Sequence, residues 1–192
     1  MKDMKKIILT IAAAAAMIPA FAGGHLSFKG VEIKGTKEEM VIALGKKGFR
    51  FEENNNGTPL VIGNFAGYKD VEVNIIGPVG SDNVTALRAE FPVKMSWVKL
   101  ENDYETLKAL LIKKYGEPSE VVEEFRDGPH DESSKKLMSL IRNNCTWKSV
   151  FDVKEGRISV YMKHQGPICC VCMLYEDAQA AASEEKAVLK EI

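Results

Sequence analysis

The sequence lacks the marks of several large functional classes. It has no glycine-rich phosphate-binding loop and no G-x-S-x-G nucleophile motif. Its 26 lysines and arginines are balanced by 27 aspartates and glutamates, whereas nucleic-acid binding is typically marked by a basic excess or a clustered basic stripe. The sequence therefore argues against nucleotide and nucleic-acid partners.

The first 22 residues have the pattern of a secretory signal peptide. Lys2, Lys5 and Lys6 precede an apolar run, 7–18, and Ala20-Phe21-Ala22 fits the small-x-small cleavage rule. The run is shorter than the roughly 20 apolar residues that a membrane span needs. We predict cleavage after Ala22, with the mature chain in the periplasm or secreted and without a membrane span.

Two segments of the mature chain repeat one order of elements, a helix and then four strands. The first repeat, 23–96, contains a helix over 36–48, which a Thr36/Glu39 capping box begins. The second repeat, 97–176, contains a helix with its cap near Asn102 and its end at Gly116. The expected strands are 49–53, 60–66, 71–76 and 84–91 in the first repeat, and 119–125, 145–153, 157–163 and 168–175 in the second.

These elements predict an α+β fold made of two tandem repeats, each with one helix packed on a four-stranded antiparallel meander. The second repeat carries an insertion, because 131–142 has a helical pattern with Asp131 as a cap. The alanine-rich segment 177–192 is expected to be a C-terminal helix or tail.

Two stretches carry a resemblance to a known family. They are Gly63-Asn64-Phe65-Ala66-Gly67-Tyr68 and Tyr115-Gly116-Glu117-Pro118. With the signal peptide, they resemble an uncharacterised family of secreted bacterial proteins, whose tandem helix-plus-antiparallel-sheet repeats are similar to the beta-lactamase inhibitor protein fold. The resemblance covers about 25–175 and implies this fold, but it implies no activity and no functional residue.

Three of the four cysteines lie within one predicted strand. Alternation places Cys170 and Cys172 on one face of that strand and Cys169 on the other, so the three thiols cannot converge on one ion. We therefore expect no metal and no cofactor, and we interpret the cysteines as buried apolar residues. With Cys169 opposite about Met162, Cys145 lies two strands away, beyond the ~7 Å Cα separation of a disulfide. A disulfide from Cys145 remains possible only if the strands are ordered differently in the sheet.

The histidines give no catalytic assignment. His130 and His164 lie in expected loops, and neither has a serine or cysteine partner in a recognisable motif. No catalytic residue is therefore assigned.

A sheet with helices on one side leaves its other face available for binding. We expect Tyr161, Tyr68 and Trp147 on that open face, with Tyr161 favoured because its neighbours Val160 and Met162 face inward. The leading hypothesis is a non-enzymatic binding module for a protein or a cell-envelope ligand, with no oligomeric state indicated. The alternative is a periplasmic hydrolase with a site at the junction of the repeats near His130 or His164.

Overall fold

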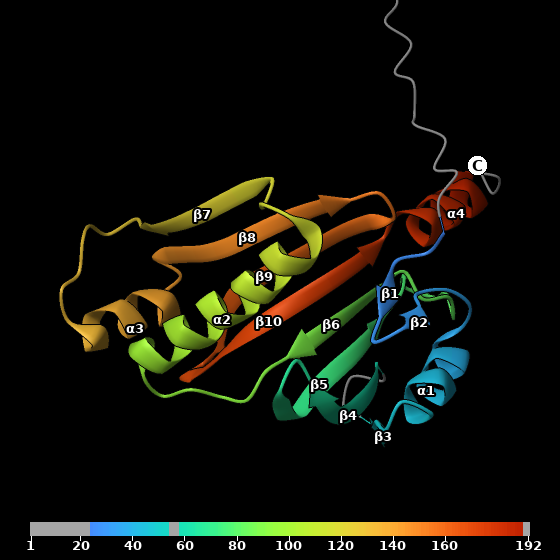
Figure 1. Ribbon diagram of the computed structural model, residues 1–192, viewed down its shortest axis with the longest axis horizontal. Helices are drawn as coiled ribbons and strands as arrows, with labels where there is room; N and C mark the ends of the chain where they lie inside the picture. The colour runs from blue at the N-terminus through green and yellow to red at the C-terminus, as the bar shows by residue number, and fades with distance from the viewer. Residues whose placement is uncertain (1–23, 54–57, 190–192) are drawn as a thin grey trace, which may run out of the picture.

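The computed structural model describes residues 24–53 and 58–189, and Figure 1 shows their arrangement. The predicted signal peptide, 1–22, lies outside the described residues. Among the residues described, no helix is long and apolar enough to cross a membrane.

The described chain has an α+β fold with antiparallel sheets, as the sequence predicts. Its helices are α1 (Lys37–Gly45), α2 (Trp97–Tyr115), α3 (Ser133–Ile141) and α4 (Ala178–Leu189). Its strands are β1 (Ser27–Phe28), β2 (Val31–Glu32), β3 (Arg50–Glu53), β4 (Pro59–Phe65), β5 (Tyr68–Ile76), β6 (Ala86–Glu90), β7 (Glu120–Phe125), β8 (Cys145–Val153), β9 (Gly156–Gln165) and β10 (Ile168–Asp177).

One large sheet carries most of the strands, in the order β3-β4-β5-β6-β10-β9-β8-β7. The strands before α2 form one half of the sheet, and those after α2 form the other. Strand β6 pairs with the last strand, β10, and this pairing joins the halves. Strands β1 and β2 form a separate hairpin that the sequence analysis did not predict.

The N-termini of α1 and α2 show where a local capping pattern does and does not determine the start of a helix. Helix α1 has the predicted capping box, with the Thr36 hydroxyl accepting from the Glu39 amide and the Glu39 carboxylate accepting from the Thr36 amide. Helix α2 begins at Trp97 rather than near Asn102, so the second predicted cap is wrong. The earlier start buries Trp97 and Leu100 against the sheet, which offsets the missing side-chain cap.

The inserted helix is shorter than predicted, and Glu132 rather than Asp131 is at its N-cap. Its buried residues Ser139 and Leu140 face the rest of the molecule, and α3 contacts α2, β8 and β9. The insertion therefore closes one end of the core between α2 and the sheet.

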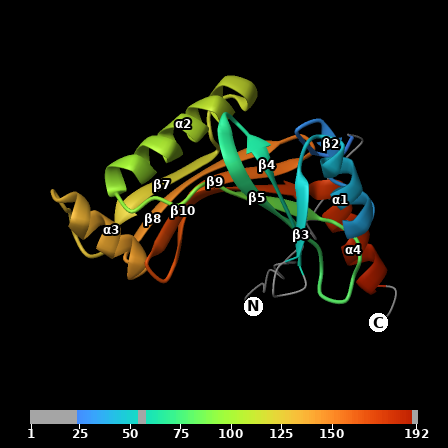
Figure 2. The ribbon, with the colours of Figure 1, turned by 90° about the horizontal axis from the view of Figure 1, so that it is seen from below.

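The two faces of the large sheet differ in what covers them. Met173, Ala89 and Val73 form one cross-strand row, and all three belong to the buried core under the helices. Alternation turns the neighbouring rows to the opposite side. Figure 2 shows α2 above the curved sheet, with α3 and α4 at its two ends. We call the side packed against α1 and α2 the covered face, and the other side the open face.

The C-terminal helix is attached through one buried carboxylate. Asp177, at the end of β10, accepts hydrogen bonds from the backbone amides of Leu26 and Ala180, and it contacts the His25 ring at 3.0 Å. Asp177 thus caps α4 and fixes the N-terminal segment beside it.

Candidate functional site

The open face of β8, β9 and β10 is hollowed into a shallow cavity of about 570 Å³. Small residues such as Ser159 are buried at its floor, because longer side chains on the neighbouring strands stand over them. Open-face residues that line the cavity include Thr146, Lys148, Arg157, Ser159, Tyr161, Lys163, Leu174 and Glu176. The lining combines an aromatic ring with three basic side chains, one carboxylate, and neutral polar and apolar groups.

Tyr161 is part of the lining of this cavity. It pairs across the sheet with Cys172 on one side and Lys148 on the other, and it is half-buried. The residues on either side of it in β9, Val160 and Met162, lie in the core, so its predicted outward orientation is confirmed. Burial raises the pKa of Tyr161, which keeps the phenol neutral.

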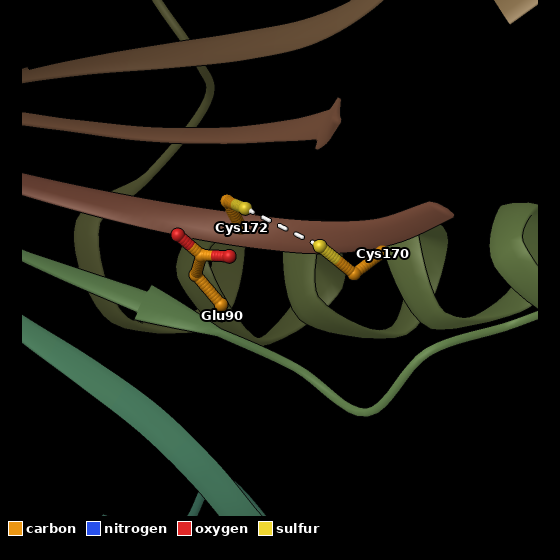
Figure 3. Close-up of side chains that lie close together, drawn as sticks. All are labelled: Glu90, Cys170 and Cys172. Atoms are coloured by element: carbon orange, nitrogen blue, oxygen red, sulfur yellow. Dashed lines mark hydrogen bonds between the residues drawn. The ribbon is translucent and has the colours of Figure 1, made fainter. Parts of the chain in front are cut away.

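Beside Tyr161, two cysteines and a glutamate converge. The Cys170 and Cys172 sulfurs lie 3.8 Å apart on β10, and the Glu90 carboxylate reaches them from β6. One ligand-type atom from each of the three residues lies within 4.8 Å of the others. Figure 3 shows the Glu90 carboxylate beside Cys172, with Cys170 further along the strand. We call Glu90, Cys170 and Cys172 the thiol–carboxylate cluster.

Two cations orient the carboxylate of the cluster. Its Oε1 accepts hydrogen bonds from Arg88 Nε at 2.8 Å and from Lys163 Nζ at 2.8 Å, while Asn74 donates from 3.4 Å. All three contacts are made to Oε1, and among the described residues no hydrogen bond is made to the second oxygen, Oε2. This second oxygen is available to a ligand.

The two thiols of the cluster differ electrostatically. The Cys172 thiol is completely buried, and its hydrogen-bond contact with Cys170, in which either sulfur can donate, lowers the pKa of Cys170. The same contact, together with burial, raises the pKa of Cys172. Cys170 is thus the first of the pair to become a thiolate, the form that binds metals and reacts as a nucleophile.

The cluster can be reached from the surface. A second cavity, of about 290 Å³, is lined by Glu90, Cys170 and Lys163. Asp70 and Glu72 also line it, so the lining contains three carboxylates beside the one ammonium group of Lys163. This excess of negative charge favours a small cation in the cavity.

The structure places the other two predicted binding aromatics, Tyr68 and Trp147, on the covered face rather than the open face, although Trp147 is also among the residues that line the cavity of about 570 Å³. Their role in binding stays a prediction. Tyr68 donates a hydrogen bond to Asp103 of α2 at 3.0 Å and packs edge-on against Phe91. Burial, followed by the charge of Asp103, raises the pKa of Tyr68 to about 12. Trp147 packs edge-on against Trp97, with ring centroids 4.9 Å apart.

The two histidines of the hydrolase hypothesis lie in different settings. His130 Nε2 is 3.0 Å from Asp127 Oδ1, and Ser139 Oγ donates to the same oxygen from 2.9 Å. The serine therefore contacts the carboxylate rather than the imidazole, and this is not the nucleophile–base–orienter order of a catalytic triad. His164 Nε2 contacts the side-chain oxygen of Asn143 at 3.1 Å.

All four cysteines are free, and Cys145 is two strands from the β10 cysteines, as predicted. The register differs from the prediction, because Cys169 pairs with His164 rather than Met162. Cys145 lies on the covered face, and burial raises its pKa to about 11.

Comparison with protein-family models, curated proteins and solved structures finds no significant match to this chain. The resemblance to secreted proteins with inhibitor-like repeats therefore stays a prediction.

Period-two alternation places Cys170 and Cys172 on one face of their strand but identifies no third ligand-type residue beside them. Alternation in 84–91 does place Glu90 on the water side, and the same reasoning places Cys170 and Cys172 together. The missing information was the β6–β10 pairing, which brings Glu90 opposite Cys172.

Proposed function

We propose that this chain is a secreted, non-enzymatic binding module that engages a protein or a cell-envelope component through its open sheet face. The observation that carries the proposal is the cavity of about 570 Å³ on that face, with Tyr161 in its lining. Aromatic residues in a concave, partly desolvated surface are the usual anchors of an interface. The signal-like N-terminus supports secretion to the periplasm or beyond.

The charges around the cavity favour a ligand with an anionic group beside an apolar one. Lys148 lies across the sheet from Tyr161, and Leu174 also lines the cavity, whereas the Lys163 ammonium is bound to Glu90. The Tyr161 ring can stack against an apolar group of the ligand while the Lys148 ammonium binds its negative charge.

We also infer that the two halves of the sheet are tandem repeats. Helix α1 is followed by β3 to β6, and α2 is followed by β7 to β10 with α3 inserted, which is the order predicted for the two repeats. In this interpretation α3 closes the end of the core in the second repeat, and its Leu140 is also part of the lining of the cavity.

Site-specific photocrosslinking tests the proposed binding face. A photoreactive amino acid at Lys148 on the open face is compared with one at Val98, which is exposed on α2 at the opposite side. Both proteins are irradiated in an envelope fraction from cells that produce the chain. We expect a discrete crosslinked product only from position 148, and we expect Tyr161→Ala to abolish it. Equal crosslinking from both positions, or none from 148, would contradict the proposal.

One contact favours the hydrolase alternative, the approach of His130 to Asp127. A hydrolase would need this pair to activate water or a hydroxyl. Our account instead gives the pair a structural role, because Asp127 also binds Ser139 of α3. Purified protein should show no His130-dependent turnover in a panel of esters, amides and glycosides. Turnover that His130→Gln removes would favour the alternative.

A further inference from the structure

We propose that Glu90, Cys170 and Cys172 bind one zinc ion, or a divalent cation of similar softness, with a fourth coordination position open to solvent. This inference concerns the thiol–carboxylate cluster and does not depend on the proposed partner-binding role. Two thiolates and a carboxylate form a donor set that suits zinc and disfavours calcium and magnesium, which prefer oxygen ligands.

The spacing of the sulfurs fits this ion. Thiolates lie about 2.3 Å from zinc, so two of them on a tetrahedral ion are roughly 3.8 Å apart. The Cys170 and Cys172 sulfurs are 3.8 Å apart. Two residues separated by one position on a strand point to the same face, and the exposed side of the pair is where Glu90 arrives from β6.

The surroundings hold the third ligand in place. Arg88 and Lys163 both bind Oε1 of Glu90, which fixes the carboxylate and leaves Oε2 for the metal. Hydrogen bonds that orient a ligand in this way are typical of the outer shell of metal sites. The same two cations also offset the negative charge of two thiolates and a carboxylate, so a divalent ion does not have to neutralise the cluster alone.

Access and burial are also consistent with an exchangeable ion. Cys172 is at the bottom of the cluster with no exposed surface, whereas Cys170 and Glu90 line the cavity of about 290 Å³. The cation would enter through this cavity, whose lining includes Asp70 and Glu72, and keep a water on the cavity side. A site with three protein ligands and one open position differs from closed structural zinc sites, which have four protein ligands.

The competing state is a disulfide between Cys170 and Cys172, formed with loss of two protons and two electrons to an oxidant. The test must therefore start from protein reduced with a phosphine and freed of metal with a chelator. Zinc is titrated by calorimetry, and cobalt is added separately to follow the near-ultraviolet charge-transfer band that thiolate ligands give. We expect one ion per chain and a thiolate-to-cobalt band.

Three variants assign the site. Replacing both ligands, Cys170→Ser with Cys172→Ser, should weaken zinc binding by at least about 100-fold and remove the cobalt band, while Glu90→Gln should weaken binding roughly 10-fold and keep the band. Cys169→Ala is the matched control, because Cys169 is equally buried on the same strand but belongs to the covered face. It should bind as the unmodified protein does.

Several results would overturn the proposal. They are the absence of stoichiometric zinc binding by the reduced protein, binding that survives loss of both ligand cysteines, and a Cys170–Cys172 disulfide that persists in the phosphine. If the double variant does not fold by circular dichroism, the cobalt band of the unmodified protein and the Glu90→Gln titration decide the question. A missing thiolate band would then reject the site.

Discussion

Strand β10 places chemically identical cysteines in two different environments. Cys169 points into the covered face, where it packs in the core with Val171 and Met173. Cys170 and Cys172 point to the open face, where they meet a carboxylate and two cations. Burial raises the pKa of Cys169, whereas the Cys172 hydrogen bond lowers that of Cys170. The side of a strand on which a residue lies, more than its type, determines what that residue can do.

The same contrast extends over the whole sheet. The covered face contains rings packed on rings, such as Trp97 against Trp147, and supplies the stability of the fold. The open face contains ion pairs and a shallow cavity, and it contributes the surface available to ligands. The same type of substitution made once on each face should separate the stabilising role of the covered face from the binding role of the open face.

The largest expected difference in stability between the two faces follows from truncating an aromatic side chain on each. Trp97→Ala removes a ring that is 1% exposed under α2, and we expect it to lower the free energy of unfolding by about 3–5 kcal/mol. Tyr161→Ala on the open face should cost clearly less, because part of that ring already faces solvent. Urea unfolding measures both values. Equal losses would contradict the division into a structural face and a binding face.

A smaller difference in stability between the two faces is expected when a single tyrosine hydroxyl is removed from each. The Tyr104 hydroxyl is 2.7 Å from Ser149 Oγ and 3.0 Å from Glu123 Oε1 beneath α2. Tyr104→Phe leaves the buried serine without this partner, so we expect a loss of about 1–2 kcal/mol in the free energy of unfolding. Tyr161→Phe is the matched control and should change it by no more than about 0.5 kcal/mol. A neutral Tyr104→Phe would show that this buried network does not stabilise the fold.

The smallest effect concerns the start of helix α1. Thr36→Ala removes the hydroxyl that accepts from the Glu39 amide, and we expect a loss of about 1 kcal/mol. Because α1 packs on β3, β4 and β5, hydrogen exchange should increase in those strands before it increases in β8 and β9. Uniform acceleration would mean that the two halves of the sheet do not open separately.

Most of the strands were predictable because turn residues separate them. The predicted strand 145–153 coincides with β8, and the other strands of the large sheet differ from their predictions mainly at their ends. The start of α2 was not predictable from a local capping pattern. It depends on burying Trp97, a tertiary gain that outweighs the preference of Asn102 for a cap.

The candidate site was predictable in part. Period-two alternation correctly separated Cys169 from Cys170, and it turned Tyr161 outward. It failed at Tyr68, because Asp70 has a positive φ of 53° that interrupts the alternation between Tyr68 and Val71. It failed at Trp147 because no local signal set which side of β8 meets the helices.

The partner of the cysteines could not be found by local reasoning. Glu90 and Cys172 are far apart in the chain, and their contact exists only because β6 pairs with β10 at the centre of the sheet. Strand order depends on the packing of the whole chain, so a cluster that spans this pairing becomes visible only in the folded structure.

The difference between the two faces can be measured directly by alkylating the native, reduced protein near pH 8 and following each cysteine by mass spectrometry. Our account predicts that Cys170, which lines a cavity and has a lowered pKa, reacts first, and that added zinc slows its reaction. Cys169 has no exposed surface and should react only when the protein unfolds, whereas Cys145 should react more slowly than Cys170 because burial raises its pKa to about 11. Modification of Cys145 or Cys169 as fast as Cys170 in the folded protein would contradict the account.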